Sequence, residues 1–177
     1  MAETPGFRRP QDVWELMTRE ERLQAAEAFW QGAQPEEQAR AEQLLAERLK
    51  FRPRSVRAMP LARKSEYLAA LVLPYVSEIL ERALVSFHLH QRRDLLGAFL
   101  DALNIPHEQG EIKSEGPITP PAPEALQAAH AVVAGQFPAH DIQVYFATLL
   151  VADPETWRGL AALAAGGAGD RSSGTDM

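Results

Sequence analysis

Residues 75–87 read YVSEILERALVSF, and this stretch carries the strongest helical pattern in the chain. Its apolar side chains recur three or four positions apart, at Val76, Ile79, Leu80, Ala83, Leu84 and Phe87. Because an α-helix takes about 3.6 residues per turn, this spacing gathers them on one face. The stretch therefore predicts an amphipathic helix that buries this face in a core.

The same pattern returns a little later in the chain, at Leu95, Leu96, Phe99, Leu100 and Leu103. The residues between the two patterns, His88 to Arg93, interrupt the apolar stripe. We predict that they form the turn of an antiparallel helical hairpin. Asn104 and Pro106 follow the second arm and are typical of a helix end.

Proline marks the starts of further predicted helices, as at Pro10, Pro35 and Pro154. A proline at the first helical position loses no hydrogen bond, and its φ is already helical. No stretch alternates apolar and polar residues over the length of a strand. We therefore expect an all-α fold, a single compact bundle of about seven or eight short helices.

The expected domain organisation follows from where apolar periodicity stops. We predict a flexible N-terminus over residues 1–9 and a main helical bundle over 10–104. A loop rich in proline and glycine over 105–123 comes before a C-terminal group of three helices, 124–165, that packs on the same body. Residues 166–177 have little to bury and are expected to form a disordered tail.

Composition excludes thiol chemistry and argues against a secreted or membrane-spanning protein. The chain has 177 residues, long enough for one compact core, and no cysteine, so disulfides and thiolate chemistry are excluded. The net charge is −6, and the first residues lack the apolar run of a signal peptide. No apolar stretch approaches the roughly 20 residues that cross a bilayer. We expect a cytoplasmic protein without a membrane span.

One segment of the chain is basic, although the whole chain is acidic. Between Lys50 and Lys64 the chain carries six basic residues and no acidic one. From this run we select Arg54, Arg57, Arg63 and Lys64 with Tyr67, hereafter the basic patch, as the candidate binding site. Charge complementarity favours an acidic protein partner, and the tyrosine would add apolar contact area.

Nucleic acid is the alternative ligand of the basic patch, because several clustered cations can neutralise several phosphates. A helix-turn-helix over Ser55 to Val72 would suit this interpretation. However, the segment offers few polar side chains of the kind that contact base edges, and the whole molecule is acidic. The acidic protein partner is therefore the first hypothesis.

The candidate ligands of a metal site are His88, His90 and His107 with Glu108. Two histidines two positions apart point in different directions on a helix, so both could face one ion only in an extended turn. Solvated turn histidines explain the same residues more simply. We expect no metal and no cofactor.

The dipeptide His140-Asp141 resembles the motif that gives the HD phosphohydrolases their name. The resemblance implies a helical, metal-dependent hydrolase, and it covers two residues. That family needs a further, distant aspartate, whereas here Asp153 follows twelve positions later, at a distance that suits a helix cap. A small metal-dependent hydrolase is thus the second alternative.

Paired carboxylates on one helix face, Glu78 with Glu81 and Asp94 with Asp101, could serve acid–base catalysis, but amphipathic helices place such pairs on their wet side by default. No catalytic motif stands out, and we assign no catalytic residue. The sequence favours a non-enzymatic helical module for protein interaction or regulation.

Overall fold

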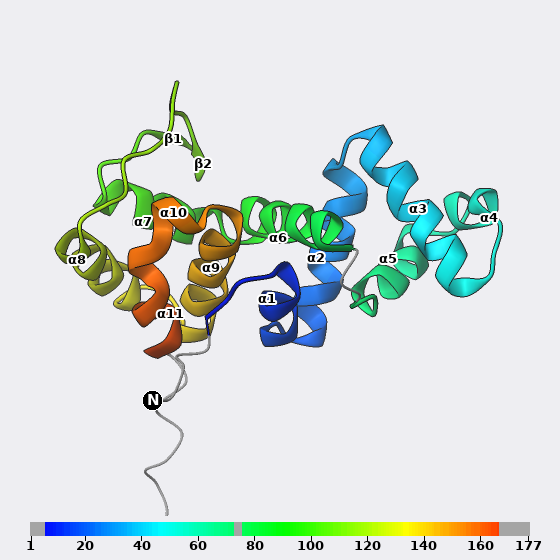
Figure 1. The fold of residues 1–177 in the computed structure, drawn as a ribbon, viewed down its shortest axis with the longest axis horizontal. Helices are drawn as coiled ribbons and strands as arrows, with labels where there is room; N and C mark the ends of the chain where they lie inside the picture. Colours follow the sequence, from blue (N-terminus) through cyan, green and yellow to red (C-terminus); the bar gives the residue numbers. More distant parts are fainter. Residues whose placement is uncertain (1–5, 73–75, 167–177) are drawn as a thin grey trace, which may run out of the picture. The chain divides into compact units, whose positions relative to one another are not determined.

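The computed structural model describes residues 6–72 and 76–166. Its regular secondary structure is helical apart from one two-stranded hairpin, as Figure 1 shows, so the predicted all-α class is confirmed. Most of the predicted tail, residues 1–5 of the predicted flexible N-terminus, and the stretch 73–75 with Pro74 lie outside the described residues.

The described helices group into two compact units. Residues 9–91 form the first, hereafter the N-terminal unit. Residues 92–166, together with residues 6–8, form the second, hereafter the C-terminal unit. The division falls inside the range 10–104 that the sequence predicts as one helical body.

The helices of the N-terminal unit are α1 (Pro10–Leu16), α2 (Arg19–Gly32), α3 (Pro35–Leu49), α4 (Pro53–Arg57), α5 (Leu61–Ala69) and α6 (Ser77–Gln91). Local sequence explains their starts. Pro10, Pro35 and Pro53 are the first helical residues of α1, α3 and α4. At the start of α2, Thr18 and Glu21 form a reciprocal capping box, in which each side chain accepts the other residue's backbone N–H.

Helix α2 is the centre of this unit, since it packs against both α5 and α6. The largest fully buried side chains here include Trp14 of α1, Phe29 of α2 and Phe87 of α6. The Trp14 indole donates a hydrogen bond of 3.0 Å to the carbonyl of Ala69 at the end of α5. A buried indole therefore keeps its hydrogen bond while it fills the core.

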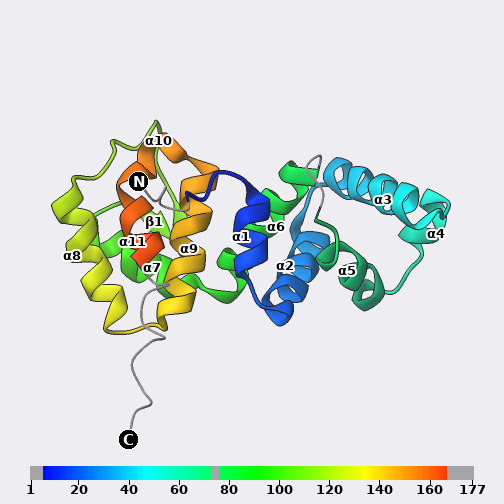
Figure 2. The ribbon, with the colours of Figure 1, turned by 60° about the horizontal axis from the view of Figure 1, so that its bottom comes forward.

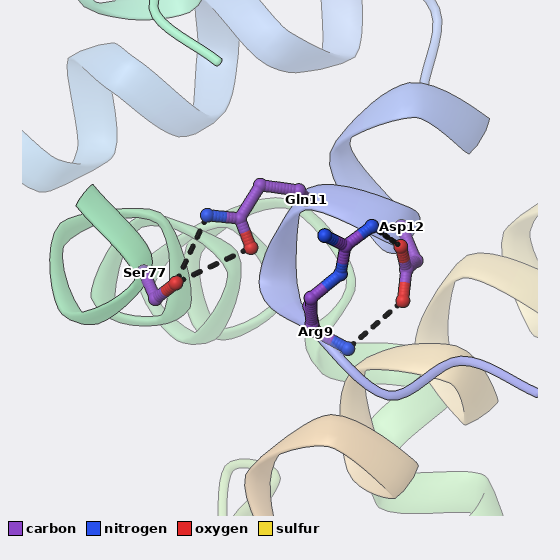
Figure 3. Close-up of polar contacts among 4 residues, drawn as sticks. All are labelled: Arg9, Gln11, Asp12 and Ser77. Carbon is purple, nitrogen blue, oxygen red and sulfur yellow. Dashed lines mark hydrogen bonds and ion pairs between the residues drawn. The ribbon is translucent and has the colours of Figure 1, made fainter. Parts of the chain in front are cut away.

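Polar contacts fix α1 onto the start of α6 (Figure 3). The buried Gln11 amide donates to the Ser77 hydroxyl at 2.9 Å, and this hydroxyl donates back to Gln11 Oε1 at 3.3 Å. On the neighbouring turn, the Asp12 carboxylate accepts the Arg9 backbone N–H at 2.9 Å. These contacts satisfy polar groups that burial or a helix start would otherwise leave without partners.

The turn predicted at His88 to Arg93 is wrong over most of its length. Helix α6 continues through Gln91, and Arg92 alone separates it from the next helix, α7 (Arg93–Ala102). The histidines interrupt the apolar stripe without stopping the helix, because a polar side chain costs helical backbone little. His88 is in fact buried.

The C-terminal unit begins with α7 and continues with α8 (Pro123–Ala134), α9 (Ala139–Ala152), α10 (Pro154–Trp157), the 3₁₀ turn η2 (Arg158–Leu160) and α11 (Ala161–Gly166). Figure 2 shows α9 and α11 side by side. The core is an aromatic cluster around Phe99, whose ring centroid lies 5.6 Å from that of Tyr145 and 4.9 Å from that of Phe146. This burial raises the pKa of Tyr145 far above its usual value.

A small hairpin departs from the sequence prediction, which had no strand in the loop 105–123. Strands β1 (His107–Glu108) and β2 (Glu111–Ile112) pair antiparallel around Gln109 and Gly110. Both turn residues have positive φ, 51° and 87°, as a two-residue type I′ turn requires. The strands are too short for any alternation to show in the sequence.

Within residues 6–72 and 76–166, no helix combines the length and the apolarity that a bilayer crossing needs.

Candidate functional site

The basic patch occupies two consecutive helices of the N-terminal unit. Arg54 and Arg57 lie one turn apart on α4, whereas Arg63, Lys64 and Tyr67 lie on α5. Helix α4 packs on α3 and helix α5 packs on α2 (Figure 1). Each half of the patch is therefore positioned by a different helix.

Arg57 is an ion-pair partner of α3. Its Nε lies 2.9 Å from Oε2 of Glu42, whose side chain is 6% exposed, whereas that of Arg57 is 68% exposed. A carboxylate removed from water in this way needs a cation or donors. Arg57 thus supports the packing of α4 on α3, in addition to presenting a charged surface.

Lys64 lies over an aromatic ring of α2. Its Nζ is 4.5 Å from the ring centroid of Trp30, a side chain that is 5% exposed. The ring face attracts the ammonium group, and the lysine stem covers the indole. Lys64 is therefore half-buried and held in place, with its charge at the edge of the surface.

Arg63 and Tyr67 are the members of the patch that the structure brings into contact with each other. The Arg63 guanidinium carbon lies 5.9 Å from the Tyr67 ring centroid, one helical turn along α5. Hydrogen bonding and charge interaction with Tyr67 raise the pKa of Arg63. The guanidinium stays exposed and charged.

Arg54 is exposed and forms no ion pair with any described residue. The same holds, within residues 6–72 and 76–166, for the flanking exposed cations Arg48, Lys50 and Arg52. No described side-chain hydrogen bond, ion pair or ring contact joins the α4 half of the patch to the α5 half. The two halves of the basic patch are therefore separate groups of cations.

Sequence reasoning missed the apolar side chains that this segment exposes. Phe51 is 45% exposed, and Leu61 and Val72 are exposed to a smaller extent. They flank the cations of α4 and α5 along the chain. An apolar residue at a helix end gives no sign in the sequence of whether it faces the core, so tertiary packing alone reveals this exposure.

The histidines of this candidate metal site do not converge on one ion. His88 and His90 lie in the last turns of α6, so the extended turn that would aim both at one ion is absent. In the C-terminal unit, the Gly110 N–H donates to His107 Nδ1 at 3.1 Å, and His107 Nε2 is 3.0 Å from Asp101 Oδ1. With Nδ1 as the acceptor, the neutral ring carries its proton on Nε2, so both nitrogens are occupied.

The aspartates that would belong to a hydrolase have structural partners. Asp141, in the first turn of α9, lies 3.2 Å from the guanidinium of Arg92. Asp153 accepts the Thr156 N–H at the start of α10, and this hydrogen bonding lowers the pKa of Asp153. This is the capping role that the sequence predicts for Asp153.

Across the part of the chain that the structure describes, no three histidine, aspartate or glutamate side chains gather as metal ligands would. Comparison with protein-family models, curated proteins and solved structures finds no match for this chain.

Proposed function

We propose that the chain is a helical interaction module, and that its basic patch binds an acidic segment of a protein partner. The observation that carries the proposal is the run of cations from Arg48 to Lys64, exposed except for the half-buried Lys64, in which Arg57 alone forms an ion pair among the described residues. Clustered surface cations steer an oppositely charged partner toward them, because long-range charge attraction favours the encounter.

The exposed apolar groups favour a protein over nucleic acid as the partner. Phe51 and Leu61 lie beside the cations in the sequence, and Tyr67 stands next to Arg63. Protein interfaces combine aromatic and apolar anchors with arginine, whereas a phosphate backbone needs mainly cations. An acidic segment that also carries apolar residues fits both features of this surface.

The test compares a short peptide of alternating Glu and Ala with single-stranded DNA of equal charge. We expect the peptide to bind more tightly, with an affinity that falls as salt rises from about 50 to about 200 mM. Arg54→Glu and Arg63→Glu should each weaken peptide binding by about 1 kcal/mol, about fivefold. Neither change removes the partner of a buried acid, as one at Arg57 would.

Arg158→Glu is the matched control, because Arg158 is an exposed cation of the C-terminal unit without an ion pair among the described residues. It changes the net charge by the same amount and should leave the affinity almost unchanged. If the control weakens binding as much as the patch variants, whole-molecule charge explains the affinity and the proposal fails. Tighter binding of the DNA would indicate that nucleic acid, and not an acidic protein, is the ligand of the basic patch.

A further inference from the structure

A hollow of about 540 Å³ opens between α2 and α5 in the N-terminal unit. Its apolar lining comes from Leu23, Ala69 and Ala70, and its charged lining from Arg19, Arg22, Glu20 and Glu66. The space exists because α5 ends in small alanines where it passes the first turns of α2. Its volume falls within the range of about 300–1,000 Å³ that small binding pockets occupy.

The hollow and the α5 half of the basic patch share one surface. Helices α2 and α5 run antiparallel, since Lys64 near the start of α5 covers Trp30 near the end of α2, while Ala70 after α5 lines the same hollow as Arg19 at the start of α2. Arg63 and Ala70 are seven residues apart, which is about two turns and about 10 Å along the same helix face.

Cations therefore flank the hollow on both sides. Arg63 and Lys64 lie toward one end, and Arg19 and Arg22 line the other. Neither Arg19 nor Arg22 forms an ion pair with a described residue. The acids Glu20 and Glu66 also line the hollow, so a bound acidic segment would keep its carboxylates beside the arginines and present an uncharged side chain to the alanines.

We propose that this hollow receives one bulky apolar side chain of the acidic segment that binds the basic patch. The inference rests on the proposed function, and it adds the feature by which the patch would select one acidic segment over another. The partner is an acidic segment with an aromatic or large aliphatic residue between its carboxylates. A side chain buried in a hollow at the centre of a contact and ringed by polar groups is the usual anchor of a protein interface.

The test uses two synthetic acidic peptides that are identical except for one central residue, Trp in one and Ala in the other. We expect the Trp peptide to bind about tenfold more tightly. Ala70→Phe adds a side chain at the exposed end of α5, where it fills the hollow. This variant should lose the preference for the Trp peptide over the Ala peptide.

Ala128→Phe is the control, because Ala128 is exposed on α8 and does not line the hollow. It should leave both affinities unchanged, and circular dichroism should show that both variants are folded. Equal affinities for the two peptides would overturn the anchor and leave the proposed function standing, as would a preference for Trp that survives Ala70→Phe. If neither peptide binds, the proposed function fails, and the anchor fails with it.

Discussion

Gln109 and Gly110, in the hairpin between α7 and α8, have positive φ, which residues with a side chain rarely adopt. Gly110 has a φ of +87°, and a Cβ built there would lie 2.7 Å from the Cβ of Leu96 in α7. The contact with the Leu96 Cβ cannot be relieved by rotating a side chain, because the backbone fixes the position of a Cβ. The Gly110 N–H also donates to the His107 ring, whose other nitrogen contacts Asp101. The turn is therefore tied to a histidine that Asp101 holds in place.

We predict that Gly110→Ala lowers the free energy of unfolding by about 1–3 kcal/mol, because it combines strain at positive φ with this close contact. Urea denaturation measures the change. Gly116→Ala is the control, since a Cβ at Gly116 meets no atom within 4 Å. Equal stability of the Gly110 variant and the wild-type protein would show that the hairpin does not pack on α7 as described.

Arg57 and Arg54 sit one turn apart on α4 with different surroundings, so alanine at each should have different consequences. Arg57→Ala leaves the buried Glu42 carboxylate without its cation and should cost about 1–3 kcal/mol of folding free energy. Arg54→Ala removes an exposed group and should change stability by less than about 0.5 kcal/mol. Equal urea midpoints for the two variants would contradict a stabilising role for Arg57.

At the scale of the element, α6 carries two glutamates one turn apart, Glu78 and Glu81. Burial of Glu81, and secondarily the charge of Glu78, raises the pKa of Glu81. A carboxyl with a raised pKa binds its proton more tightly in the folded state, so folding is relatively favoured at low pH. The penalty appears as pH rises from the ordinary pKa of glutamate through the raised pKa.

Glu81→Gln removes this penalty, and we predict that it raises the free energy of unfolding at neutral pH. The gain should shrink as pH falls below the ordinary pKa of glutamate, where the wild-type carboxyl is protonated in both states. Thermal or urea unfolding across this range measures it. Glu27→Gln serves as the comparison, because Glu27 is a half-buried glutamate of α2 without an ion pair among the described residues. A gain in stability from Glu81→Gln that does not depend on pH would contradict the explanation.

At the scale of the whole molecule, each unit has its own buried aromatic core. Phe29 and Phe87 belong to the N-terminal unit, and Phe99 and Phe146 to the C-terminal unit. A unit with its own core can open without the other. Each unit should therefore respond most to the substitutions made within it.

Hydrogen exchange followed by mass spectrometry tests this independence. Gly110→Ala should speed amide exchange in residues 92–166 more than in residues 9–91, because the strain lies in the C-terminal unit. Arg57→Ala should show the reverse distribution, because Glu42 and Arg57 lie in the N-terminal unit. Equal acceleration throughout both units would indicate one cooperative body.

Local sequence was enough to predict the all-α class, the helix starts at proline and at Thr18, and the capping role of Asp153. These features depend on neighbours within about one turn, such as the Glu21 N–H that the Thr18 hydroxyl accepts. The stripe at residues 75–87 likewise predicted α6, and its buried side chains include Ile79, Leu84 and Phe87. The sequence also identified the cations that make up the basic patch.

The contacts of those cations depend on the packing of distant segments. Glu42 precedes Arg57 by fifteen residues, and Trp30 is still further from Lys64 in the chain, so no local pattern could pair them. The length of α6, the hairpin at Gly110 and the exposure of Phe51 depended on packing as well. Local hydrogen bonds and periodicity act within a few residues, whereas burial depends on which distant segments cover a side chain.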